Sequence, residues 1–206
     1  MTLDLKNVEN LSFEPSPFIF NWWLFLCAGS IFNIFVYFKI IRNANDSKIK
    51  CENTREYCET MKWLALPYVI QCAWRSFWPE IYNVRVVFWD TWLSSIFIGR
   101  SLATIGEIAW IVQVGYGFIR ANQEIKALSG SRGDLTFIEG MINWCAMIAV
   151  ICCTLAEFFC NYAMITGNFL YNVYETSLWT FALGCLIPCS LYLFEKARHI
   201  TVVNGN

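Results

Sequence analysis

The chain has 206 residues, of which 57% are hydrophobic, 17% aromatic and 15% charged, and its formal net charge is −1. Soluble domains carry about 25% charged residues, so this composition excludes an ordinary soluble domain. The near-neutral balance also provides no basic patch of the kind that nucleic-acid binding needs. The mean hydropathy of +0.43 and the long apolar runs predict an integral membrane protein.

Taken in chain order, the apolar runs predict an all-α fold, a multi-pass transmembrane helical bundle with five spans. A helix needs about 20 apolar residues to cross a bilayer, and an open strand edge cannot be satisfied in lipid. A single integral-membrane domain then covers residues 1–206, with spans near 18–41, 61–78, 86–119, 139–166 and 176–198. Six segments result instead if the chain breaks near Gly167.

Lysine and arginine residues predict the orientation in the membrane. The five-span arrangement puts eleven of them on one side, in the first and third loops and the C-terminal tail, and only Lys6 and Arg85 on the other. Positively charged loops stay in the cytoplasm. We therefore expect the N-terminus outside or in the lumen and the C-terminus in the cytoplasm. Asn10 is then a formal glycosylation site if the host is eukaryotic.

The predicted third span carries charges inside an otherwise apolar stretch. Asp90, Arg100 and Glu107 would each cost about 2.5–3.5 kcal/mol in hydrocarbon, so we expect them to face the bundle interior and one another. On a helical wheel Arg100 and Glu107 nearly eclipse, and Thr104 lies on the same broad arc. This face predicts a polar interior.

The opposite face of the same span repeats a small residue every four positions, at Ser95, Gly99 and Ala103. Small side chains let two membrane helices approach closely. The pattern predicts a central helix, and it also offers a contact for a homo- or hetero-oligomer.

A second polar stripe runs along the fourth predicted span and continues past its end. Its members stay within about 60° of one another on a helical wheel. They are Glu157, Asn161, Asn168, Asn172 and Glu175. Three amides and two carboxyls on one stripe are not expected to face lipid.

Polar and ionisable residues of the spans form the candidate ligand-binding or proton-handling set. They are Arg75, Asp90, Arg100, Glu107, Glu157, Asn161, Asn168, Asn172 and Glu175. One interpretation is a structural ion-pair network joining the second, third and fourth helices, because removing one partner of a buried pair strands a charge. The other is a polar cavity, in which the like-charge pair Glu107 and Glu157 leaves one carboxyl neutral and able to exchange a proton.

Several chemistries lack the residues they require. His199, the single histidine, lies beyond the last predicted span, so a histidine-rich metal site and a bis-histidine haem are excluded. A phosphate-binding glycine loop, HExxH and GxSxG are absent from the sequence. The ten cysteines match no zinc or iron–sulfur spacing and are expected to fill helix contacts, with Cys51 and Cys58 alone in a loop. No metal or cofactor is predicted.

Three functions stay open. The first is a membrane protein whose buried polar site binds or moves a small polar or amphipathic ligand, an ion or a proton, with Arg100 anchoring an anionic group. The second is a membrane-embedded lipid-modifying enzyme that uses carboxylate acid–base chemistry, although the sequence identifies no catalytic residue. The third is a non-catalytic subunit of a larger membrane complex. In each, membrane lipids are partners and nucleic acid is not.

Overall fold

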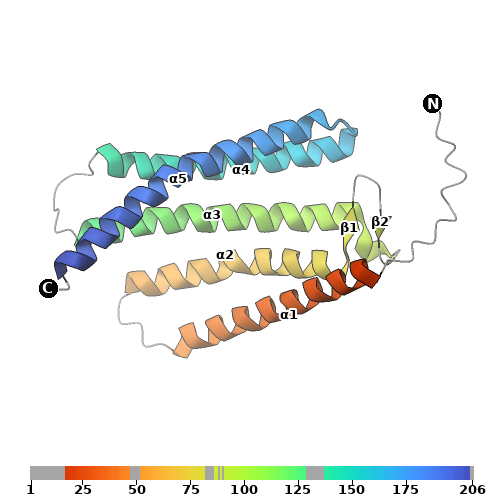
Figure 1. The fold of residues 1–206 in the computed structure, drawn as a ribbon, viewed down its shortest axis with the longest axis horizontal. Helices are drawn as coiled ribbons and strands as arrows, with labels where there is room; N and C mark the ends of the chain where they lie inside the picture. Colours follow the sequence, from red (N-terminus) through yellow and green to blue (C-terminus); the bar gives the residue numbers. More distant parts are fainter. Residues whose placement is uncertain are drawn as a thin grey trace, which may run out of the picture. The chain divides into compact units, whose positions relative to one another are not determined.

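A computed structural model describes residues 17–46, 52–81, 86–87, 89, 91–128 and 137–204. The described chain is all-α, apart from one short strand pair (Figure 1). Its helices are α1 (Pro17–Asp46), α2 (Glu52–Phe77), α3 (Ile96–Leu128), α4 (Phe137–Thr166) and α5 (Leu170–Asn204). Between α2 and α3, β1 (Glu80–Ile81) pairs antiparallel with β2 (Val86–Val87). Asn10, Cys51 and Asp90 lie outside the described residues.

Four helices of the described chain are long and apolar enough to cross a membrane. Their apolar segments are Pro17–Asn43, Ile96–Leu128, Phe137–Thr166 and Leu170–Ile200. These are the helices of an integral membrane protein, as the sequence predicts. The helix α2 is long enough as well, but its first half carries Arg55, Glu56, Glu59 and Lys62 and is too polar to join the four. The fifth span stays a prediction.

The chain divides into two compact units. Unit 1 contains Met1–Lys48 and Val69–Leu102, and unit 2 contains Ile49–Tyr68 and Ala103–Asn206. The helix α2 passes from unit 2 to unit 1 directly after Tyr68. Its internal proline, Pro67, stands at this point.

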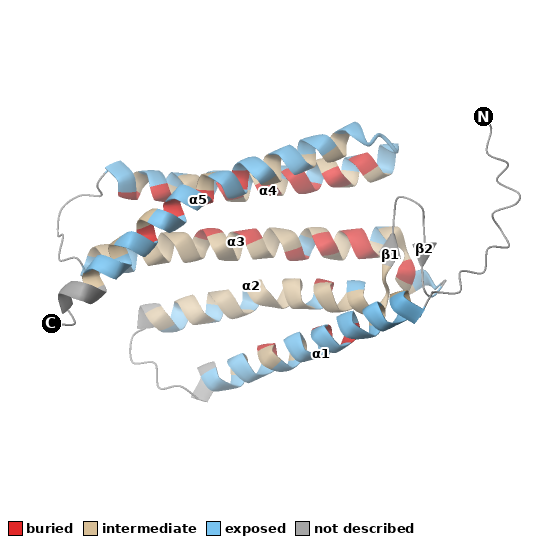
Figure 2. Cartoon of the chain, viewed as in Figure 1, coloured by how far each residue is buried: buried red, intermediate tan, exposed pale blue. Residues whose placement is uncertain are grey.

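In unit 1, a chain of small polar side chains joins α1 to the end of α2. The hydroxyl of Ser30 donates to the hydroxyl of Ser76 at 2.7 Å, and Ser76 donates to the carbonyl of Cys72 at 2.8 Å. The rest of α1 is largely exposed (Figure 2), with Phe18 at 78%. A helix with so much exposed apolar surface is suited to contact with lipid or with another membrane helix.

The predicted start of the third span is wrong. The helix begins at Ile96, because Val86 and Val87 pair as a strand, a 3₁₀ turn lies at Trp92–Ser94, and Ser95 is extended. The hydroxyl of Ser94 donates to the carbonyl of Trp89 at 2.5 Å, a local bond that competes with helix formation. Ser95 therefore precedes α3, and the predicted relation of Asp90 to Arg100 concerns a residue outside those that the structure describes.

In unit 2, one face of α4 is a seam of buried residues spaced alternately three and four apart. They are Glu139, Ile142, Ala146, Ala149, Cys153, Ala156, Cys160 and Ala163. This is the spacing of a helix that packs along its length against neighbours, and the small side chains permit close approach. The helix α5 repeats the pattern on the face that packs against α4, with Ala182, Leu186, Cys189 and Leu193 buried.

The turn between α4 and α5 is set by Gly167. Its φ of +67° lies in the left-handed region, which favours glycine and ends α4 at Thr166. The predicted break near Gly167 is therefore confirmed. It yields no sixth segment, because α5 begins at Leu170 and continues unbroken to Asn204.

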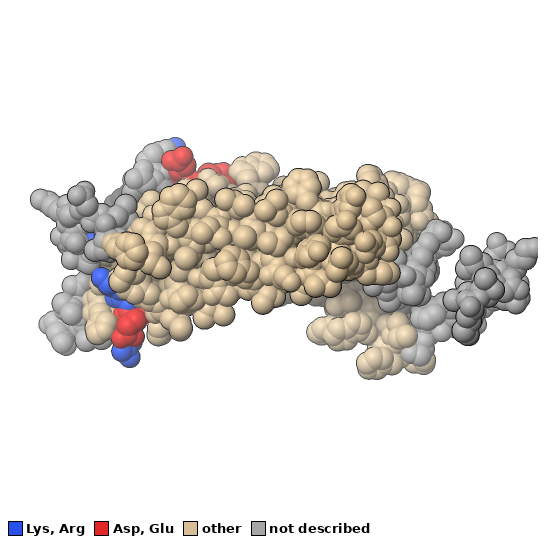
Figure 3. Space-filling view, turned by 90° about the horizontal axis from the view of Figure 1, so that it is seen from above, with Lys and Arg blue, Asp and Glu red and all other residues tan. Residues whose placement is uncertain are grey.

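A cluster of charged side chains lies near the end of α5. Glu195 accepts from Arg198 at 2.7 Å, and His199 Nε2 lies 3.1 Å from the same carboxylate oxygen. In Figure 3 the blue and red atoms lie toward the end where α5 finishes, and the long middle of the drawn face has none. This distribution is expected of helices that cross a hydrocarbon layer.

Close approach of α3 to α4 depends on Gly115. We expect Gly115→Ala to lower the melting temperature of the detergent-solubilised protein, because the new Cβ would lie 2.8 Å from Val150 Cγ2 and 3.4 Å from the Ala146 carbonyl oxygen. Such overpacking costs about 1–3 kcal/mol. The control Gly184→Ala, on α5, meets nothing within 4 Å and should leave the melting temperature unchanged or slightly raised. Equal melting temperatures would contradict the close contact.

Candidate functional site

Glu157 is the most deeply buried carboxyl among the described residues, with 1% of the residue exposed. It lies nine residues before Thr166, the last residue of α4, which corresponds to about 13 Å along the helix. Half of the hydrocarbon core measures about 15 Å. If α4 crosses the membrane with Thr166 at the edge of the hydrocarbon core, Glu157 lies close to the middle of the bilayer.

A short chain of hydrogen bonds leads to this carboxyl from α3 and from the next turn of α4. The hydroxyl of Thr104 on α3 donates to Glu157 Oε2 at 3.0 Å. The side-chain amide of Asn161 donates to Thr104 Oγ1 at 2.9 Å and to the backbone carbonyl of Glu157 at 2.7 Å. The three polar residues thus join α3 to α4 inside unit 2.

The Thr104 hydroxyl accepts a hydrogen from the Asn161 amide and donates its own to Glu157 Oε2. Thr104 and Asn161 are half-buried, and Ala156 and Cys160, beside Glu157 on α4, are buried and uncharged.

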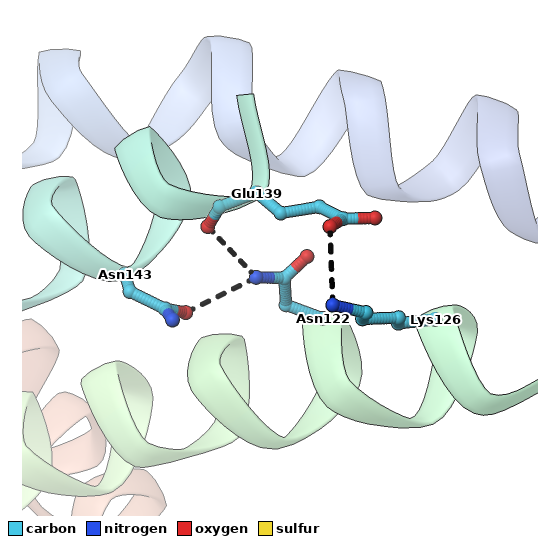
Figure 4. A network of polar contacts seen from close by, with 4 residues as sticks. All are labelled: Asn122, Lys126, Glu139 and Asn143. Atoms are coloured by element: carbon cyan, nitrogen blue, oxygen red, sulfur yellow. Dashed lines mark hydrogen bonds and ion pairs between the residues drawn. The ribbon is translucent and has the colours of Figure 1, made fainter. Parts of the chain in front are cut away.

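A second buried carboxyl lies near the start of α4, and the sequence analysis missed it. Figure 4 shows Asn122 and Lys126 of α3 facing Glu139 and Asn143 of α4. The amide of Asn122 donates to the Glu139 carbonyl at 3.0 Å and to Asn143 Oδ1 at 3.1 Å. Lys126 Nζ lies 3.9 Å from Glu139 Oε2. The signal was present, since Lys126 and Glu139 flank the short connector between the two helices.

The other predicted residues of the charged set fall in different places. Arg100 is 5% exposed on α3 and belongs to unit 1. Arg75 belongs to the same unit and is exposed at the end of α2. Glu107 is half-buried on α3 in unit 2. Asp90 lies outside the described residues.

The predicted stripe from Glu157 to Glu175 does not run along one helix, because Gly167 ends α4. Asn168 is exposed in the turn, where its Oδ1 accepts from the backbone N–H of Leu170 at 3.1 Å. This bond satisfies one of the first free N–H groups of α5. Asn172 and Glu175 are half-buried in the first turns of α5. Of the predicted amides, Asn161 is the one that joins Glu157 through Thr104 among the described residues.

Within the described ranges, no three His, Cys, Asp or Glu side chains gather in a way that could hold a metal ion. Comparison of the chain with protein-family models, with curated proteins and with solved structures finds no match. The function has to be argued from the site alone.

We expect Thr104 to contribute more to the stability of the protein than a threonine that bonds only within its own helix. We expect Thr104→Val to destabilise the protein by about 1–3 kcal/mol, because it removes a hydrogen bond from a buried carboxyl. Thr154→Val is the matched control, since the Thr154 hydroxyl only bonds the Val150 carbonyl of its own helix, at 2.8 Å. Thermal melts in detergent compare the two, and Thr104→Ser should restore most of the loss. If the two valine variants melt alike, the Thr104 contact is not made.

Proposed function

We propose that this protein binds or moves a small polar or amphipathic ligand, an ion or a proton within the membrane, at a site centred on Glu157. The observation that carries the proposal is a carboxyl with 1% exposure, inside a helix long and apolar enough to cross a membrane and bonded to a hydroxyl of the neighbouring helix. A charge in hydrocarbon costs about 2.5–3.5 kcal/mol on insertion scales. Ionisable groups kept at that cost usually mark ion paths, proton relays or ligand sites.

The hydrogen-bond chain offers a way for charge at Glu157 to change helix packing. While Glu157 is ionised, the Thr104 hydroxyl donates to it and ties α3 to α4. Proton or cation binding at the carboxylate would weaken that bond, because the oxygen becomes a poorer acceptor. The Asn161 amide, which donates to the same hydroxyl, would then have to change its hydrogen-bond geometry. Binding is thereby coupled to the contact between two membrane helices.

We also propose that α2 is the fifth span, with the C-terminus in the cytoplasm. If α2 crosses the membrane, eleven Lys and Arg residues lie on the cytoplasmic side and two on the other. If it does not, the same thirteen residues divide seven to six, with the larger number between α1 and α3. The strong asymmetry of the five-span arrangement is the usual pattern of membrane proteins.

A second candidate function is a subunit of a larger membrane assembly. The observation that favours it is α1, whose most apolar stretch is only 17% buried. Its exposed aromatic side chains, among them Trp22 and Phe25, could pack against helices of another chain as well as against lipid.

The Glu157 proposal is tested by infrared difference spectroscopy on the protein reconstituted in lipid vesicles. We expect a carboxyl band that changes with pH in the unmodified protein and is missing from Glu157→Gln. The matched control is Glu139→Gln, which removes a different buried carboxyl from the same helix and should keep the band.

Native mass spectrometry of the same variants separates the two candidate functions. A small molecule or ion retained by the unmodified protein and lost in Glu157→Gln supports the proposed site. Stoichiometric partner chains, with no pH-dependent carboxyl band, would overturn it in favour of the assembly subunit.

The five-span topology is tested with an epitope tag inserted between residues 46 and 52 and a second tag at the C-terminus. We expect both tags to be accessible from the cytoplasmic side of sealed membranes, because four spans, α2 to α5, would lie between them and an even number of crossings returns the chain to the same side. Tags on opposite sides would show that α2 does not cross.

A further inference from the structure

An apolar groove runs along the outer surface of unit 2 between α3 and α4. Its free volume is about 300 Å³, at the lower end of the range of small-molecule sites. The residues that line it include Val112, Gly115 and Ile119 from α3 and Ala146, Met147 and Ile151 from α4. Met147 and Ile151 are 48% and 55% exposed, so the groove opens outward.

The groove exists because two residues at its base are small. Gly115 has no side chain, and it approaches α4 so closely that an added Cβ would meet Val150 and the Ala146 backbone. Larger residues on both helices, such as Ile119 and Met147, form its walls. Both helices are apolar enough to span a membrane, and in a membrane this opening would face hydrocarbon.

Polarity changes along the groove in one direction. On α3, Gln123 follows Ile119 by four residues and Lys126 follows it by seven, so both continue the same face toward the α3–α4 connector. On α4, Asn143 precedes Met147 by four residues and continues its face toward the same connector. The Lys126 side chain is 22% exposed and lies 3.9 Å from Glu139. An occupant thus meets apolar walls at Gly115 and polar groups farther on.

We propose that this groove holds one acyl chain of a bilayer phospholipid, whose headgroup phosphate lies toward Lys126 and Asn143. The apolar walls suit hydrocarbon, and the polar end suits a headgroup, so the lipid belongs to the leaflet on the side of the α3–α4 connector. Basic groups between membrane helices on the cytoplasmic side commonly receive lipid phosphates. The proposal is independent of Glu157.

The test uses the full chain in nanodiscs of phosphatidylcholine that contain a minor fraction of phosphatidylcholine with a photoreactive diazirine in its acyl chain. After irradiation, the crosslinked positions are mapped by peptide mass spectrometry. We expect crosslinks at Met147 and Val112 to exceed several-fold those at Phe32 and Phe35, which are exposed on α1 and meet ordinary bulk lipid.

Two tryptophan variants on α4 provide the comparison. Ile151→Trp places a large side chain in the groove and should reduce the crosslinking of Met147 several-fold. Ile148→Trp, at an exposed neighbour outside the groove lining, should leave it unchanged. Glu157→Gln should also leave it unchanged, so failure of the lipid site and failure of the Glu157 site are distinguishable.

Several outcomes would overturn the proposal. Crosslinks spread evenly over exposed positions of α1 and α4 would mean that only bulk lipid contacts the groove. Equal crosslinking in Ile151→Trp and Ile148→Trp would mean the same. A dimer in native mass spectra that disappears in Ile151→Trp would assign the groove to a helix of a second copy.

Discussion

Close packing along α4 is the constraint on which unit 2 depends. Helices in lipid gain no hydrophobic free energy from meeting each other, so their association relies on van der Waals contact and hydrogen bonds. The seam of alanines and cysteines on α4, with Gly115 opposite on α3, brings the backbones near enough for both. At that separation a short side chain such as Thr104 can reach Glu157 across the contact. A seam of large residues would hold α3 and α4 too far apart for this hydrogen bond.

The sequence predicts α1, α4 and much of α5 well, because charge-free apolar runs long enough to span a bilayer leave few alternatives. It fails at the start of the predicted span 86–119, where the described residues are apolar enough for a span but form a short strand, Val86–Val87, and a 3₁₀ turn, Trp92–Ser94. Hydropathy does not distinguish these outcomes, whereas the local Ser94–Trp89 bond does.

The candidate site is predictable only in part, for a similar reason. Helical periodicity groups Glu157 with Asn161, and Thr104 with the polar arc of α3, because each group lies on one helix. Their meeting depends on the register of two helices, which periodicity does not contain. The predicted stripe does not continue past Gly167, because the left-handed conformation of this residue interrupts the helical periodicity on which the stripe depends. The Asn122 and Glu139 contacts likewise depend on the path of the connector.

Pro67 makes α2 easier to bend at one point along its length. A proline has no N–H, so the carbonyl of Trp63 lacks its usual helical partner, and the ring crowds the preceding turn. That gap lies at the point where α2 leaves unit 2 for unit 1. Bending costs less there than in α3, which crosses the same division between Leu102 and Ala103 with no proline in its length. Of the two helices that connect unit 1 with unit 2, α2 therefore bends more easily than α3.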